Sequence, residues 1–144
     1  MPSFAFGGEK QERVEVEVHG YERPPTGDYY DDNWLRSSVS IAAGAFSGNF
    51  DTAFLTADFS EFRDQLQSLY ESLASTASFE TLEEQLSLAL VDDGRGGFLL
   101  KGVAVDVLGT SNRLESGIAF DQSDLLSALE GLNDIVSQFP VRPD

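Results

Sequence analysis

The fold is decided by residues 58–74, which read DFSEFRDQLQSLYESLA. Apolar side chains recur in this segment every three or four residues, the spacing that places them on one face of an α-helix. They are Phe59, Phe62, Leu66, Leu69 and Leu73. Asp58, followed three residues later by Glu61, resembles a capping box, so we expect the helix to begin at Asp58 and to reach about Ala74.

The residues before this helix alternate between apolar and polar side chains, which is typical of a β-strand with one buried face. The clearest case is residues 12–19, ERVEVEVH, where Val14, Val16 and Val18 share one side. An FAF segment near the N-terminus alternates in the same way and ends at a Gly-Gly pair. We therefore expect the chain to open as a β-hairpin.

Two more strands are predicted between a loop and the helix. Residues 20–32 contain prolines, glycines and an acidic, Tyr-rich patch, and we expect them to form the loop. Apolar side chains then alternate over residues 34–43 and again over residues 46–55, with a bend or bulge at residues 47–49. Trp34 begins the first of these strands and is expected in the core.

The second half of the chain passes again from strand spacing to helix spacing. Residues 86–90 and 98–108 lie on either side of an Asp-Gly pair, a strong hairpin signal because Gly and Asp tolerate positive φ. The expected buried face of the return strand is Leu99, Val103, Val105 and Val107. A further strand is predicted over residues 114–120.

A second amphipathic helix is predicted over residues 122–139. The residues of its apolar stripe are Leu125, Leu129, Leu132, Val136 and Phe139. Asp121 or Ser123 can cap its N-terminus, and Pro140 ends it.

These elements predict an α+β fold in one domain, residues 1–144. Strands joined by turns rather than by crossover helices form antiparallel sheets. We therefore expect a meandering, curved antiparallel sheet, packed on its apolar face by the two helices at about 58–74 and 122–139. At 144 residues and 41% hydrophobic residues the chain is long and apolar enough for one core. The sequence shows no internal repeat.

The chain is strongly acidic. Twenty-five Asp and Glu residues face nine Lys and Arg residues, a formal net charge of −16, and the acids are spread along the sequence. Such a surface repels nucleic acid and anionic membranes and speeds encounter with basic proteins, although it can also serve solubility alone. Cysteine is absent, and the N-terminus lacks the pattern of a signal peptide. We expect a cytoplasmic protein that binds a protein partner and neither nucleic acid nor membrane.

Few residues could support catalysis. His19 is the single histidine, it alternates out from a predicted strand, and no GxSxG motif accompanies it. The glycine-rich residues 94–97 lead into a strand, whereas a phosphate-binding loop leads into a helix N-terminus. We therefore expect no enzyme, no cofactor and no metal site.

The predicted loop contains the best candidate for partner binding. Its residues are Asp28, Tyr29, Tyr30, Asp31 and Asp32. Tyrosine is enriched at protein interfaces because one end packs while the other forms hydrogen bonds. The alternative is that one or both tyrosines fold back over the edge of the sheet.

Two short motifs flank this candidate loop. Residues 20–24 read GYERP, and residues 31–35 read DDNWL at the start of a predicted strand. The later layout is similar, with residues 120–125, FDQSDL, entering the last helix. Together they resemble the WapI-type family of small bacterial immunity proteins, through the pattern GYExP followed by DxNWL.

The resemblance implies a cytoplasmic antidote that binds and neutralises the toxic C-terminal domain of a contact-delivered bacterial toxin, in the name-giving pair an RNase-type domain. It implies no catalytic residues. A nuclease domain that holds phosphates tends to be basic, which suits an acidic binder. Two other hypotheses remain open at this stage: an interaction or housekeeping domain with no toxin partner, and an enzyme that uses a pair of carboxylates.

Overall fold

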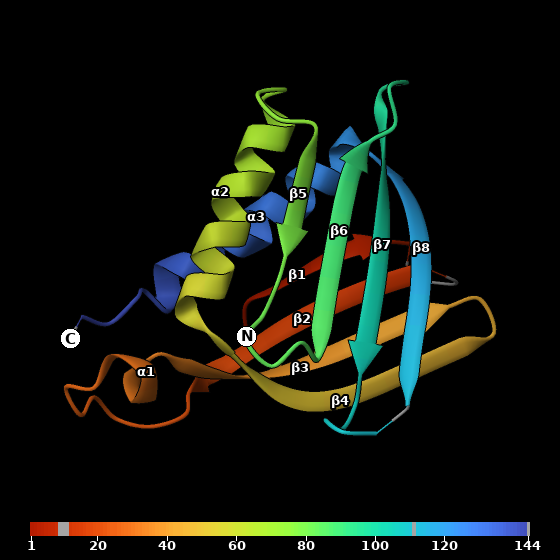
Figure 1. Cartoon of the computed structure of the whole chain (residues 1–144). Coiled ribbons are helices and arrows are strands. Elements are labelled where there is room, and N and C mark those ends of the chain that lie inside the picture. The colour runs from red at the N-terminus through yellow and green to blue at the C-terminus, as the bar shows by residue number, and fades with distance from the viewer. Residues whose placement is uncertain (9–11, 111, 144) are drawn as a thin grey trace.

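Within residues 1–8, 12–110 and 112–143, which this computed structural model describes, the chain forms two four-stranded antiparallel sheets and three helices (Figure 1). The first sheet contains, in order, β1 (Ser3–Gly7), β2 (Glu12–Tyr21), β3 (Trp34–Ala43) and β4 (Phe46–Leu55). The second contains β5 (Thr76–Phe79), β6 (Leu86–Asp92), β7 (Gly97–Val105) and β8 (Arg113–Asp121). The helices are α1 (Tyr29–Asp32), α2 (Thr56–Tyr70) and α3 (Gln122–Gln138).

The order of elements repeats, because each set of four strands is followed by a long helix. The predicted α+β class is confirmed, with the difference that the strands form two sheets rather than one curved sheet. The sheets face each other at a steep angle, and α2 and α3 lie together at one side (Figure 1). Alternation in a sequence marks one buried face for each strand, but it does not say which strands pair or which faces meet.

The core between the sheets is rich in phenylalanine. Phe4 from β1 lies 5.6 Å from Phe62 of α2 and 5.8 Å from Phe79 of β5, measured between ring centroids. Phe54 of β4 lies 5.3 Å from the same Phe79 ring. Tilted and edge-to-face pairs of this kind stabilise a core beyond the area that they bury. The rings therefore join both sheets and α2 in one apolar cluster.

The first long helix begins at Thr56 and ends at Tyr70, earlier at both ends than the sequence predicts. Asp58 takes the third position of the helix rather than the capping position, and its carboxylate accepts a hydrogen bond of 2.9 Å from the Leu55 N–H. The helix ends early because Ser72 adopts a φ of +61°. Leu73, expected in the apolar stripe, is consequently exposed.

The buried face predicted for the return strand β7 is wrong. Phe98, Leu100 and Ala104 point into the core, whereas Leu99 points outward and is 48% exposed. Both faces of β7 are apolar, so alternation alone could not choose between them.

Two predictions for the first sheet also differ from the structure. The bend or bulge at residues 47–49 is wrong, because β4 pairs with β3 in an unbroken register from Phe46 to Leu55. Trp34 is partly buried, since the inward position at the start of β3 belongs to its neighbour Leu35. No helix in the described part of the chain is long and apolar enough to cross a membrane.

Candidate functional site

The carboxylate of Asp32 organises the candidate loop from the inside. The side chain is 2% exposed, and it accepts hydrogen bonds from the Thr26 N–H and hydroxyl, both at 2.7 Å, and from the Gly27 N–H at 2.8 Å. Burial alone would raise the pKa of Asp32, but these hydrogen bonds and the charge of Arg142 outweigh it and lower the pKa. An ionised Asp32 therefore stabilises the bend of the chain before α1.

Asn33 connects the loop to the C-terminal segment of the chain. Its side-chain NH₂ donates to the carbonyl of Tyr29 at 2.7 Å and to the carbonyl of Arg142 at 2.9 Å. Its side-chain oxygen accepts from the Thr56 hydroxyl at 2.7 Å and from the Arg142 N–H at 2.8 Å. All four hydrogen-bonding positions of this buried amide are filled.

Arg142 completes this connection. Its guanidinium carbon lies 3.4 Å from the centre of the Tyr21 ring, and the group donates to the carbonyl oxygens of Arg23 at 2.9 Å and Asp32 at 3.4 Å. The Tyr21 hydroxyl in turn donates to the carbonyl of Pro140 at 2.6 Å. We refer to Tyr21, Asp32, Asn33 and Arg142 as the clasp. Three of the four belong to the motifs GYERP and DDNWL, so these motifs have a structural role here.

The clasp presents the other loop residues outward. Asp28 caps α1 by accepting a hydrogen bond of 3.1 Å from the Asp31 N–H, and both side chains are exposed. Tyr30 is 61% exposed and packs edge-to-face on the partly buried Tyr29, with ring centroids 5.2 Å apart. Of the five candidate residues, the structure therefore places Asp28, Tyr30 and Asp31 at the surface, Tyr29 at its margin and Asp32 inside.

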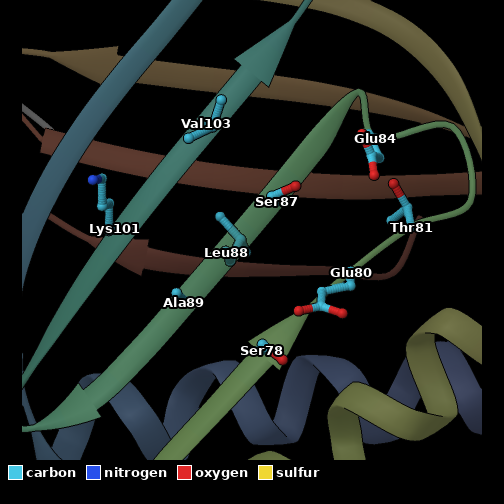
Figure 2. A pocket seen from close by; sticks show the side chains of 9 residues that line it. All are labelled: Ser78, Glu80, Thr81, Glu84, Ser87, Leu88, Ala89, Lys101 and Val103. Atoms are coloured by element: carbon cyan, nitrogen blue, oxygen red, sulfur yellow. The ribbon is translucent and has the colours of Figure 1, made fainter.

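A second candidate surface is the outer face of the β5–β8 sheet, and the sequence reasoning missed it. One row of residues crosses this face from β5 to β8, and each residue is the cross-strand partner of the next: Ser78, Ala89, Lys101 and Gly117. Three shallow hollows, of about 420, 340 and 520 Å³, share Lys101 in their lining. Figure 2 shows the first of them, with Ser78, Ala89 and Lys101 on neighbouring strands. The sequence did contain a signal for this surface, because β7 has apolar residues at both its inward and its outward positions.

His19 lies between a serine and a carboxylate, the arrangement of side chains found in a hydrolase triad. Its Nε2 lies 2.9 Å from the Ser38 hydroxyl, and its Nδ1 lies 3.7 Å from the Glu17 carboxylate. Nδ1 is closer to the sulfur of Met1, at 2.8 Å, so the carboxylate does not orient the ring. None of the three hollows described above includes these residues. Among the described residues, no group of three or more His, Cys, Asp or Glu side chains could hold a metal ion.

Comparison with known proteins gives two findings. The model of the immunity protein WapI-like family matches residues 5–140 of this chain. Among solved structures, the chain is similar to one described as crystal structures of Trypanosoma bruciei MRP1/MRP2, with a TM-score of 0.52 over 96% of this chain and 86% of that one. The identity is 10%, so this likeness shows the fold alone. None of the curated proteins matches the sequence.

Proposed function

Because the chain belongs to the immunity protein WapI-like family, we propose that it neutralises the toxic C-terminal domain of a contact-delivered bacterial toxin by stoichiometric binding in the cytoplasm. The family match over residues 5–140 is the observation that carries this proposal. The exposed side chains of Asp28, Tyr30 and Asp31 support it, because exposed carboxylates and tyrosines suit recognition of a protein.

The charge of the chain supports a basic partner. A net charge of −16 raises the rate of encounter with a basic domain and opposes encounter with nucleic acid. A toxin domain that cleaves nucleic acid has to attract phosphates, so it would have the complementary sign. We therefore propose a basic, nuclease-type toxin domain as the partner.

The loop is the proposed contact for this partner. Asp28 and Asp31 supply exposed carboxylates, and Tyr30 supplies an aromatic ring that becomes desolvated on binding. Tyr29 packs edge-to-face against the Tyr30 ring and so helps to fix its position. Asp32 contributes indirectly, because its buried carboxylate sets the shape of the loop that the partner meets.

The test uses the C-terminal domain of a large secreted protein whose reading frame lies beside the gene for this chain. If no such reading frame exists, an interaction domain with no toxin partner is favoured instead. The domain is titrated with the purified chain while its toxic activity is followed. A stoichiometric inhibitor lowers the toxic activity in proportion to the amount added, and the activity is fully lost at one chain per domain. Protection at a small fraction of that ratio would show turnover, and loss of protection in a folded His19→Ala variant would direct attention to the Ser38–His19–Glu17 group. No binding at all would contradict the proposed function.

A further inference from the structure

The outer face of the β5–β8 sheet has the composition of a docking surface. Outward positions of a solvated antiparallel sheet are usually polar, whereas this face contains Val91, Leu99 and Ala119 in one row across three strands. Val91 is 41% exposed and Leu99 is 48% exposed. Two apolar side chains this open, next to each other on paired strands, form a continuous apolar area that water covers in the free protein.

Small residues make this face concave. Ala89 and Gly117 flank Lys101 on its two neighbouring strands, and Ser78 lies beyond Ala89. The three hollows that meet at Lys101 form where these short side chains stand beside longer ones. Open depressions over small residues accept large side chains from a flat partner surface, and fully desolvated contacts of that kind provide most of the affinity at interfaces.

The charges on this face select the partner. Lys101 is one of two lysines in the chain and lies at the centre of the face, where a partner would bury its ammonium group. A buried ammonium requires an acceptor, most favourably a carboxylate. Glu80, Glu84 and Glu115 lie in the lining of the same hollows and offer acceptors for basic side chains around that centre.

We propose that this face docks the toxin domain, through large apolar side chains of that domain around a carboxylate that pairs with Lys101, and through basic side chains that reach Glu80, Glu84 and Glu115. The inference rests on the proposed function and adds a second contact surface to that of the loop. A second copy of this chain fits less well, because each copy has a net charge of −16 and the two would repel each other.

The test compares two substitutions on this face with a matched control. Ala89→Arg fills the hollows, and Lys101→Glu reverses the central charge; both positions are exposed, so the fold should tolerate them. Ser40→Arg is the control, because Ser40 is also small and exposed, on the outer face of the other sheet, and the substitution adds the same charge as Ala89→Arg. The probe is the same toxin domain as in the test of the proposed function, measured by surface-binding kinetics. Melting temperature and sedimentation are recorded for every variant.

We expect Ala89→Arg and Lys101→Glu to weaken binding by about 30-fold or more, mainly through faster dissociation, as removal of an interface hot spot does. Ser40→Arg should stay within about 3-fold of the unsubstituted chain, and all melting temperatures should agree within a few degrees. If the unsubstituted chain binds and both face variants match the Ser40→Arg control, the docking face is overturned while the proposed function stands. If the unsubstituted chain itself does not bind, both fail. A dimer of the free chain that Ala89→Arg dissociates would assign the face to a second copy and overturn the inference.

Discussion

The guanidinium group of Arg142 lies over the ring of Tyr21, with its central carbon 3.4 Å from the ring centre. The two residues are far apart in the sequence, and the contact joins the C-terminal segment to the end of β2. Asn33 holds the backbone of Arg142 through two further hydrogen bonds. The C-terminal segment is therefore part of the structure that shapes the candidate loop.

The first prediction concerns this contact. Arg142→Ala removes a cation–π contact and two hydrogen bonds to carbonyl oxygens, so the free energy of unfolding should fall by about 1–3 kcal/mol. Denaturant unfolding measures the change. Arg95→Ala, at an exposed turn position, is the control and should change stability by less than about 0.5 kcal/mol. A loss for Arg142→Ala that is no larger than the small loss expected for Arg95→Ala would show that the Arg142 side chain adds nothing to stability.

The second prediction separates the two neighbouring carboxylates of the loop. Asp31→Asn removes an exposed charge, so it should slow association with the toxin domain, reduce the dependence of that rate on salt, and leave the fold intact. Asp32→Asn places an amide NH₂ near the donors of Thr26 and Gly27, so it should lower the melting temperature. Association rates at low and high salt, together with thermal unfolding, test both. If Asp31→Asn lowered the melting temperature and Asp32→Asn left it unchanged, the geometry of the loop would be contradicted.

The third prediction concerns the exposed aromatic side chain of the loop. Tyr30→Ala should speed dissociation of the toxin domain with little change in association, because desolvated aromatic contacts determine residence time. The fold should be unaffected, since the side chain is 61% exposed. Stopped-flow or surface-binding kinetics give both rates. An unchanged dissociation rate would remove Tyr30 from the interface.

The fourth prediction tests the core. Leu66 is fully buried in α2, so Leu66→Ala should lower the free energy of unfolding by about 2–5 kcal/mol, the range for truncation of a buried leucine. Leu73→Ala is the matched control, because Leu73 lies beyond the end of α2 and is 76% exposed. Its effect should be below about 0.5 kcal/mol. A loss under about 1 kcal/mol for Leu66→Ala would contradict the packing of α2.

The fifth prediction concerns pH. Partial burial raises the pKa of Asp58 to about 6, with Glu61 adding repulsion and the Leu55 N–H opposing the shift. A raised pKa in the folded state means that the folded chain retains the proton after the unfolded chain has lost it, so stability falls as pH rises from about 4 to about 6. Asp58→Asn removes the titrating group and therefore this loss. The free energy of unfolding of the variant, relative to that of the unsubstituted chain, should rise by about 1–2 kcal/mol from about pH 4 to about pH 7, allowing for solvent screening. Urea unfolding of both proteins at the two pH values measures it, and a constant difference would contradict the shifted pKa.

The predictions from sequence were most accurate where one face of an element is apolar and the other polar. The strand over residues 34–43 has the predicted bounds, and the helix beginning at Gln122 has Asp121 as its cap, one of the two predicted candidates. They failed for β7, where both faces are apolar, and they missed β5, whose four residues are too few for a periodic pattern.

The candidate site divides in the same way. Composition and local pattern identified an acidic, Tyr-rich segment, because tyrosines and carboxylates are local features of the sequence. They predicted a loop over residues 20–32, whereas β2 extends to Tyr21 and Tyr29–Asp32 form the short helix α1. The opposite roles of Asp31 and Asp32 depend on which side chain meets the Thr26 and Gly27 donors, and that follows from the bend of the chain rather than from residue type.

The sequence by itself determined the α+β class, the long helices and the acidic surface, because periodicity and charge are properties of neighbouring residues. Only the tertiary structure decided that the strands divide into two sheets, that Arg142 meets Tyr21, and that Ala89, Lys101 and Gly117 share one open face. These relationships join residues distant in the chain. They depend on which apolar faces bury one another, and local spacing does not contain that information.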